Sequence, residues 1–285
     1  MMEEIRLYDM NSIEFSELID TARMELKNIN LADSLETISD YAFSGCSNLE
    51  KIKIPKGTIT IGNNAFNNCT SLKELNIPKN ITNIGESAFA WCSGLEKITV
   101  DEGNQYYDSR DNCNALIETN TNILIQGASN VIIPNTVKII GKYSFAGNMN
   151  LKEIDIPEGV EEIQREAFYF CKNIEKFKLP KSITKIGISS FGACDNATIW
   201  VYKDSFAKNY AKENGLNYKC IDASEIWVYV AKKDYKAFEA VDTQGMYIGL
   251  RYDDGRRENI SEGIEIYRKQ YKFQIWRYIL YSFSI

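Results

Sequence analysis

Six segments of this 285-residue chain repeat one pattern of apolar and polar positions. Each contains a Phe that follows a small residue, at Phe43, Phe66, Phe89, Phe145, Phe168 and Phe191. Neighbouring Phe residues are 23 positions apart, apart from one step of 56 between Phe89 and Phe145. An Ile lies five residues before every Phe, and three residues after it lies a Cys in five copies and Asn148 in the sixth. A fixed period of this length predicts a solenoid in which each repeat packs on its neighbours.

Each repeat also contains a short alternating segment that predicts a strand. In the copy from Leu72 to Pro78, alternation places Leu75 and Ile77 on one face and Glu74 and Asn76 on the other. Pro78 ends this strand because proline has no N–H to donate to a ladder. We expect the strands to stack in parallel about 4.8 Å apart, with the Phe residues in a continuous ladder inside the solenoid.

The frame L-x-x-I-x-I-P-x-x-I-x-x-I-G-x-x-A-F-x-x-C, nearly complete from Leu72 to Gly94, resembles the BspA-like leucine-rich repeat of bacterial surface proteins. The resemblance covers about residues 26–220, and residues 106–119 resemble an insertion common in that family. It implies a right-handed leucine-rich repeat solenoid with parallel strands on its concave face. The frame departs at Ser39 and Gln164, which replace Gly, so Gly there is expected to favour a positive φ without being required.

We expect three parts in the chain. Residues 1–30 form an N-terminal helical cap and the first repeat strand, since Phe15, Leu18, Ile19, Ala22 and Leu26 have helical spacing. Residues 31–221 form the repeats, with an insertion at about 101–133 that contains a hairpin and a capping helix at 204–215. Residues 222–285 form a small aromatic-rich α+β domain, so the whole belongs to the α+β class with a repeat solenoid.

The C-terminal part departs from the repeat frame at Asp222. Its pattern predicts strands at 226–230 and 246–252, a helix at 234–241, a turn at 253–255 and closing strands at 271–275 and 279–285. Enzyme or effector activity in this part, with the repeats as a targeting arm, is the main alternative to a binding scaffold.

The amino-acid composition excludes several kinds of catalytic site and argues against some partners. The chain has no His, which excludes Ser-His-Asp and Cys-His nucleophiles and HExxH zinc sites. A net charge of −6 argues against nucleic acid as a partner, and no apolar run is long enough for a membrane span. Met1 to Arg6 carries acids where a secretory signal has basic residues. We therefore expect a cytoplasmic protein if the chain is complete, whereas the resemblance suggests the cell surface or secretion.

Several groups of residues are candidates for a metal, catalytic or membrane-binding site, but each has a simpler structural explanation. The seven Cys are predicted to be buried and reduced, because copies 23 residues apart point the same way and form no CxxC cage. The acids of the insertion, Asp101, Glu102, Asp108 and Asp111, do not follow the EF-hand order, which disfavours calcium. Asp253, Asp254 and Glu258 could supply the two carboxylates of a glycosidase, although an Asp-Gly turn is favoured. The basic and aromatic run at 267–278 has the period of a half-solvated sheet rather than of a membrane-binding helix. No cofactor is expected.

The outward strand positions are the candidate binding surface. They are Lys51, Lys53, Glu74, Asn76, Lys97, Thr99, Glu153, Asp155, Lys176, Lys178, Trp200 and Tyr202. The charge alternates between repeats, so Lys51, Glu74 and Lys97 are expected to neutralise one another. Trp200 and Tyr202 form a candidate platform for a sugar or peptide, unless the C-terminal part covers them. The sequence therefore predicts a non-catalytic leucine-rich repeat scaffold for protein interaction or adhesion, with a protein ligand first and a cell-surface glycan second.

Overall fold

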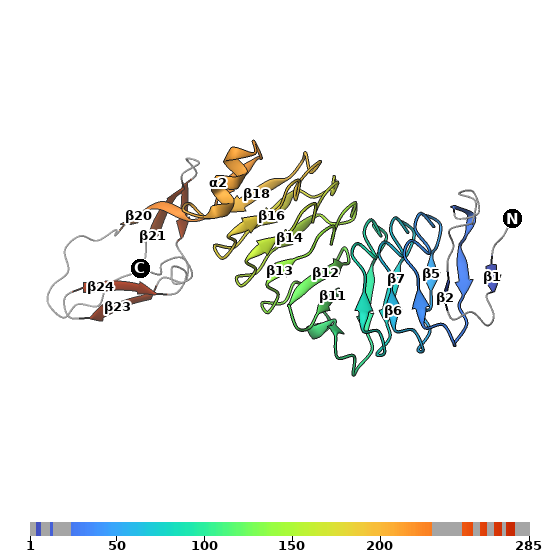
Figure 1. The fold of residues 1–285 in the computed structure, drawn as a ribbon. Coiled ribbons are helices and arrows are strands. Elements are labelled where there is room, and N and C mark those ends of the chain that lie inside the picture. The colour runs from blue at the N-terminus through green and yellow to red at the C-terminus, as the bar shows by residue number, and fades with distance from the viewer. Residues whose placement is uncertain are drawn as a thin grey trace.

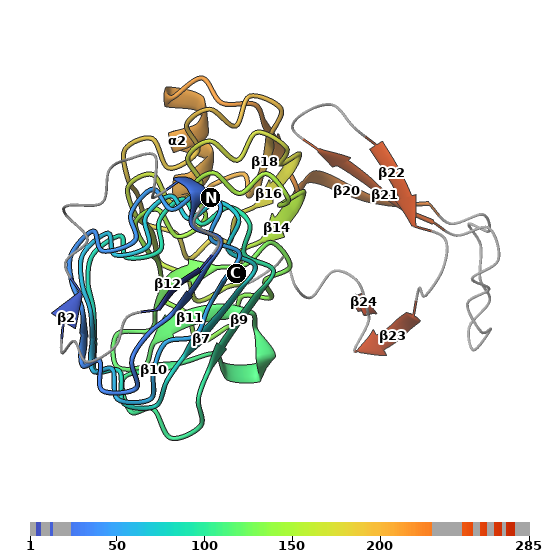
Figure 2. The same ribbon diagram turned by 90° about the vertical axis from the view of Figure 1, so that its right-hand side faces the viewer.

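The computed structural model describes residues 4–6, 12–13, 24–229, 247–252, 257–260, 265–269 and 272–276. Over most of this length the chain winds into a β-solenoid whose rungs stack along one axis (Figure 1). In the view along the solenoid, the rungs before the insertion project onto one another (Figure 2). Among the described residues the only α-helix of a full turn or more is α2 (Phe206–Glu213). The predicted repeat solenoid is confirmed.

One face of the solenoid carries the longer strands in three parallel stacks. The stacks are β1-β3-β5, β7-β9 and β14-β16-β18-β19. Their strands are β1 (Glu4–Arg6), β3 (Asn28–Asn30), β5 (Lys51–Ile52), β7 (Glu74–Ile77), β9 (Lys97–Val100), β14 (Glu153–Asp155), β16 (Lys176–Lys178), β18 (Thr198–Val201) and β19 (Tyr218–Cys220). The burial pattern of β7 alternates from exposed Glu74 to buried Leu75, as predicted. The outward side chains of these strands form what we call the strand face.

A second face carries two-residue strands at the Ile that precedes each Phe. They are β2 (Ser12–Ile13), β4 (Thr37–Ile38), β6 (Thr60–Ile61) and β8 (Asn83–Ile84) before the insertion, and β13 (Ile139–Ile140), β15 (Glu162–Ile163) and β17 (Lys185–Ile186) after it. All of their pairings with each other are parallel. These strands end at two residues because the chain then turns towards the buried Phe.

The Phe residues form the predicted ladder, in two pieces. Phe66 stacks between Phe43 and Phe89, with ring centroids 5.2 and 5.5 Å apart. Beyond the insertion, Phe168 stacks between Phe145 and Phe191 at 4.9 and 5.8 Å. All of these rings are buried. The ladder is interrupted between Phe89 and Phe145, so the solenoid has two cores instead of the continuous one expected from the period.

The turn before each Phe has a positive φ, but not at the frame Gly. The angle is 59° at Tyr41, 53° at Asn64 and 56° at Ser87, each two residues before a Phe. Gly62 and Gly85 have no positive φ, so the expected role of Gly was wrong. A Cβ on Gly62 would overlap the backbone nitrogen of Asp40 in the preceding rung. Gly is used there because two rungs approach closely.

The Cys ladder is buried and reduced, as predicted. The Cys69 thiol donates to the carbonyl of Phe43 in the preceding rung at 3.2 Å, and the Cys171 thiol donates to that of Phe145 at 3.1 Å. Asn148 bonds differently, because its side-chain oxygen accepts from the amides of Asn150 and Leu151 within its own turn. Asn148 therefore bonds to amides of its own turn, where Cys69 and Cys171 bond to a carbonyl of the preceding rung.

The insertion contains the predicted hairpin. It comprises β10 (Tyr107–Asp108), the 3-10 turn η1 (Arg110–Asn112), β11 (Ala115–Glu118) and β12 (Ile123–Gly127). β11 and β12 are antiparallel, with Ile117 opposite Leu124. Leu116 packs into the first core, whereas Ala115 and Ile117 pack into the second. The hairpin therefore separates the two halves of the solenoid.

At the C-terminal end of the repeats, α2 starts after Ser205, whose side chain accepts from the amide of Lys208. β19 then adds a parallel strand to β18. β20 (Ala223–Tyr229), β21 (Tyr247–Tyr252) and β22 (Arg257–Ile260) form an antiparallel sheet, and β23 (Glu265–Lys269) pairs with β24 (Lys272–Trp276). The strands expected at 226–230, 246–252 and 271–275 are present, and β23 contains the start of the run at 267–278 that was predicted to be sheet. β22 was not predicted. The helix expected at 234–241, the turn at 253–255 and the strand at 279–285 lie outside the described residues. So does the helix expected before Leu26, except for Met24 and Glu25, which are helical.

Candidate functional site

Ten of the twelve residues predicted to form a binding surface lie on the strand face, and Lys53 and Tyr202 directly follow the ends of β5 and β18. Lys51, Lys53, Glu74, Asn76, Lys97, Glu153 and Asp155 are exposed, whereas Thr99, Lys176, Lys178, Trp200 and Tyr202 are half-buried. The hairpin divides them into two sets of six, because Thr99 belongs to the first half and Glu153 to the second. The face is therefore two surfaces, which differ in their charge contacts.

In the first half the predicted neutralisation of charges is wrong. Glu74 lies directly across from Lys97, but within residues 24–222 Lys51, Glu74 and Lys97 form no ion pair. Such exposed pairs gain little free energy over their hydrated side chains. Instead Asn76 donates to Asp101 at 3.0 Å and accepts from Thr99 at 2.8 Å.

In the second half the opposite charges do meet, around Lys176. Its ammonium lies 3.1 Å from Glu153 and 3.7 Å from Asp155, while Lys178 lies 3.6 Å from Asp155. The hydrogen bond that Lys176 donates to Glu153 raises the pKa of Lys176, which keeps this ammonium charged. This half of the strand face therefore carries a fixed charge pattern, whereas in the first half Lys51, Glu74 and Lys97 remain outside such a network.

Trp200 and Tyr202 are partly covered by cations. The ammonium groups of Lys176 and Lys219 lie 5.0 and 5.2 Å from the centre of the Trp200 ring. Lys181 lies 4.9 Å from the centre of the Tyr202 ring. Burial, with the nearby acids Glu158, Asp222 and Asp155, raises the pKa of Tyr202, so its hydroxyl stays protonated. These lysines occupy ring surface that a stacked sugar would need.

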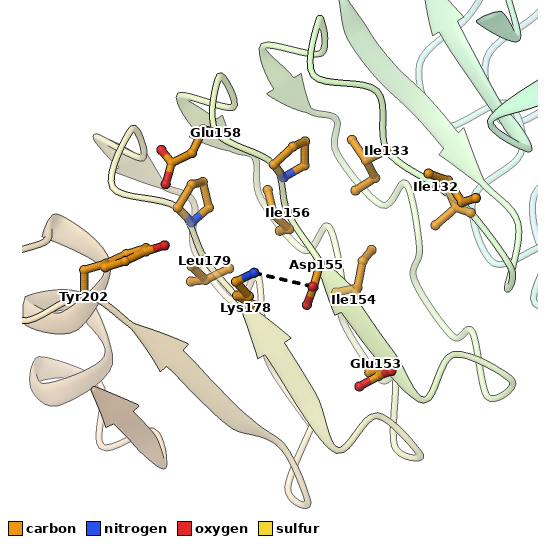
Figure 3. A pocket seen from close by; sticks show the side chains of 13 residues that line it. Ile132, Ile133, Glu153, Ile154, Asp155, Ile156, Glu158, Lys178, Leu179 and Tyr202 are labelled. Carbon is orange, nitrogen blue, oxygen red and sulfur yellow. Dashed lines mark ion pairs between the residues drawn. The ribbon is translucent and has the colours of Figure 1, made fainter. Parts of the chain in front are cut away.

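A groove crosses the second half of the strand face and brings four of the predicted residues together. It has a volume of about 450 Å³ and is lined by residues 131–133, 153–158, 178–180 and Tyr202. Figure 3 shows Asp155 and its ion-pair partner Lys178 in the middle of this groove, between Ile132 on one side and Tyr202 on the other. We call it the strand-face groove.

Ile132 is a groove residue that was not predicted. It lies 56 residues after Asn76, so the repeat frame places it at an outward position. Its side chain is 76% exposed, so an apolar surface is available at this side of the groove. The step of 56 residues between Phe89 and Phe145, counted from Asn76, would have located it.

Two of the four acids of the insertion, Asp101 and Asp108, accept hydrogen bonds from neighbouring side chains. Asp108 accepts two side-chain hydrogen bonds from Arg110, at 2.7 and 2.6 Å, and Arg110 also reaches Asn122 and Thr136. Asp108 and the neighbouring Asp111 raise the pKa of Arg110, with the Asp108 hydrogen bond as the largest cause. Within the described residues no group of three or more Cys, Asp or Glu gathers as a metal site would require.

The remaining candidate groups lie mostly beyond the described side chains. Asp253 and Asp254 are outside the described residues, and Glu258 is placed only as a backbone position in β22. Part of the basic and aromatic run lies in the hairpin β23-β24, which agrees with its predicted period of two. No described helix is long and apolar enough to cross a bilayer.

The stacked rungs, parallel strands and Phe ladder define this chain as a leucine-rich repeat solenoid. A BspA type Leucine rich repeat region (6 copies) matches residues 21–123 and 117–240. The chain therefore belongs to the BspA-type leucine-rich repeat family, as its sequence indicated.

Several solved structures are similar to this chain. A leucine-rich repeat protein from Eubacterium ventriosum shares its fold and is 26% identical with a TM-score of 0.57, over 71% of this chain and 60% of the other. The pneumococcal vaccine antigen PcpA is 19% identical with a TM-score of 0.44, over 68% of this chain and 67% of its own. A Treponema pallidum protein, TpLRR, is 23% identical with a TM-score of 0.36, over 69% and 73%. A comparison with curated proteins gave no match.

Proposed function

We propose that this chain is a non-catalytic scaffold that binds a protein ligand through the strand-face groove. The observation that carries the proposal is the groove itself, which combines an apolar side chain, an aromatic ring and a fixed set of charges. Ile132 and Tyr202 stand at its two sides, with the ion pair of Asp155 and Lys178 between them. A mixture of apolar anchors and oriented polar groups is typical of protein-binding surfaces.

The end of the insertion contributes to this surface. Residues 131–133 close one side of the groove and come directly after the hairpin that separates the two cores. The groove therefore depends on both the insertion and the repeats, which supports the predicted role of the insertion in binding.

A protein ligand is favoured over a glycan by the surroundings of the aromatic residues. Sugars stack on free aromatic faces, but Lys176, Lys219 and Lys181 lie over the rings of Trp200 and Tyr202. Carboxylates and ammonium groups next to an exposed Ile suit peptide side chains of either charge.

The test is a random peptide display library selected against the full chain. Peptides that bind the groove should bind at least tenfold more weakly to Tyr202→Ala and Lys178→Glu variants, a loss of about 1.4 kcal/mol or more. The matched controls are Tyr41→Ala and Lys185→Glu, which change an exposed Tyr and an ion-paired Lys away from the strand face. Selected peptides whose affinity responds only to the control variants, or a library that yields no binder, would contradict the proposal.

A further inference from the structure

The insertion interrupts the stacking of the rungs and so creates four sheet edges inside the solenoid, where a regular stack would have none. These are the facing sides of β8 and β9 in the first half and of β13 and β14 in the second half. Each presents backbone groups that lack the next regular rung. Exposed sheet edges of this kind attract other strands, so proteins usually cover them.

Three of these four edges are covered by the insertion. The Asn114 side chain accepts from the amide of Ile98 in β9 at 2.9 Å and donates to the carbonyl of Glu96 at 3.0 Å. The hydroxyl of Tyr107 accepts from the amide of Ile84 in β8 at 2.9 Å. β13 pairs with β12. The edge of β14 is different.

β14 pairs only with β16, on the side away from the insertion. Its other side faces residues 131–133, which are not in a strand. Within residues 24–229 no backbone hydrogen bond joins residues 129–134 to residues 151–157. Elsewhere successive rungs are joined at this frame position, for example by the amide of Lys73 to the carbonyl of Glu50 and the amide of Glu175 to that of Lys152.

The direction of the free backbone groups follows from the strand geometry. The amide of Ile156 donates to the carbonyl of Lys178 at 2.9 Å, so it points towards β16. Alternate residues of a strand point their N–H and C=O to opposite sides. The N–H and C=O of Asp155, one residue earlier, therefore point towards residues 131–133.

The strand-face groove lies at this open edge. Residues 131–133 and 153–158 both line it, and Figure 3 shows Ile132 and Ile133 set apart from β14. Its rim carries three carboxylates, Glu153, Asp155 and Glu158, and one ammonium, that of Lys178. The ammonium of Lys176, which does not line the groove, also pairs with Glu153 and Asp155, so carboxylates still outnumber ammonium groups by three to two. Segment 153–158 contains six residues, which corresponds to about 20 Å of extended chain.

We propose that a partner protein adds an extended segment to the free edge of β14, with basic side chains at alternate positions. This inference rests on the proposed function and specifies how the groove binds. Backbone hydrogen bonds to Asp155 supply affinity, as in other cases of strand addition. The excess of carboxylates over the ammonium groups of Lys176 and Lys178 selects for Arg or Lys. The exposed Ile132 contacts the apolar side chains that alternate with the basic ones.

The test uses the full chain and a fluorescein-labelled six-residue peptide of alternating Arg and Val, measured by fluorescence anisotropy up to 1 mM peptide. Asp155→Pro removes the outward N–H, which an edge strand tolerates, while Asp155→Asn removes only the charge. We expect Asp155→Asn to weaken binding about threefold and Asp155→Pro to weaken it about tenfold further, as the loss of edge hydrogen bonds predicts. Peptides with Glu in place of Arg should bind at least tenfold more weakly than the Arg peptide.

A second set of peptides keeps the test decisive if Asp155→Pro does not fold. Methylation of the backbone nitrogens on one edge of the Arg-Val peptide should abolish binding, whereas methylation on the other edge should leave it unchanged. Equal affinity of both methylated peptides, or no binding of the unmodified peptide at 1 mM, would overturn strand addition. So would slow hydrogen exchange of the Asp155 amide in the peptide-free protein, because another part of the chain would then cover the edge. In each of these cases, library peptides that still respond to Tyr202→Ala would leave the proposed function standing.

Discussion

Gly127 leaves no room for a side chain next to the buried Phe145. It ends β12, and a Cβ added there would overlap the Cε1 and Cζ atoms of Phe145. Phe145 cannot move away easily, since it is fully buried and its ring stacks on Phe168 at 4.9 Å. A Gly127→Ala substitution should therefore destabilise the protein.

The expected change in the free energy of unfolding follows from two opposing effects of Gly127→Ala. Overpacking a buried site typically costs about 1–3 kcal/mol, and direct overlap with a stacked ring belongs at the upper end of that range. Replacing Gly by Ala also stabilises by about 0.4–1 kcal/mol, because the unfolded chain loses freedom and Gly127 does not have a positive φ. We expect a net loss of about 2 kcal/mol.

The assay is urea unfolding followed by circular dichroism, on a double-mutant cycle with Phe145→Leu. The smaller side chain removes the ring atoms that the new methyl group would meet. Phe145→Leu alone should cost about 1–2 kcal/mol, and adding Gly127→Ala to it should cost less than about 0.5 kcal/mol more. Additive losses in the double variant would show that contact with Phe145 is not the reason for Gly127.

Three further predictions concern the thiols, Asn148 and the insertion. The hydrogen bond with Cys92 and burial raise the pKa of Cys69, so the unfolded state loses this proton first as the pH rises. The free energy of unfolding should be constant below about pH 8.5 and fall by about 1.4 kcal/mol per pH unit above it for each such thiol. Cys69→Ala should reduce this slope in urea titrations from about pH 7 to 10. Asn148→Ala should cost about 1–3 kcal/mol in the same assay, because two buried-turn amides lose their acceptor; a loss below 0.5 kcal/mol would contradict this. Arg110→Ala should speed amide exchange in residues 107–122 by mass spectrometry, because Asp108 loses its partner, while Arg165→Ala, an exposed ion-paired control, should not change exchange there.

The repeat frame could be predicted because its residues perform one task in every rung. Phe66 and Phe168 have the same neighbours on both sides, so a single explanation covers both. The same holds for the thiols of Cys69 and Cys171, each of which meets the Phe carbonyl of the rung before. Periodicity alone is enough wherever neighbouring rungs are equivalent.

Features that depend on distance across the rungs could not be predicted in this way. Opposite charges at Glu74 and Lys97 share a register without forming an ion pair, whereas Lys176 reaches Glu153. The role of Gly62 follows from the approach of Asp40, which no sequence pattern records. The groove likewise depends on how far residues 131–133 lie from β14, although both segments fit the frame.

A stack of identical rungs offers a partner only its surface, because every internal backbone group is used by the next rung. An inserted hairpin changes this, since it separates two halves and leaves backbone groups without neighbours. Here the side chains of Asn114 and Tyr107 satisfy those groups in the first half, and β12 satisfies β13. The edge at Asp155 has no such cover from residues 129–134. We therefore expect the specificity of this scaffold to reside at the discontinuity, where groups that the repeat frame normally uses are available to another chain.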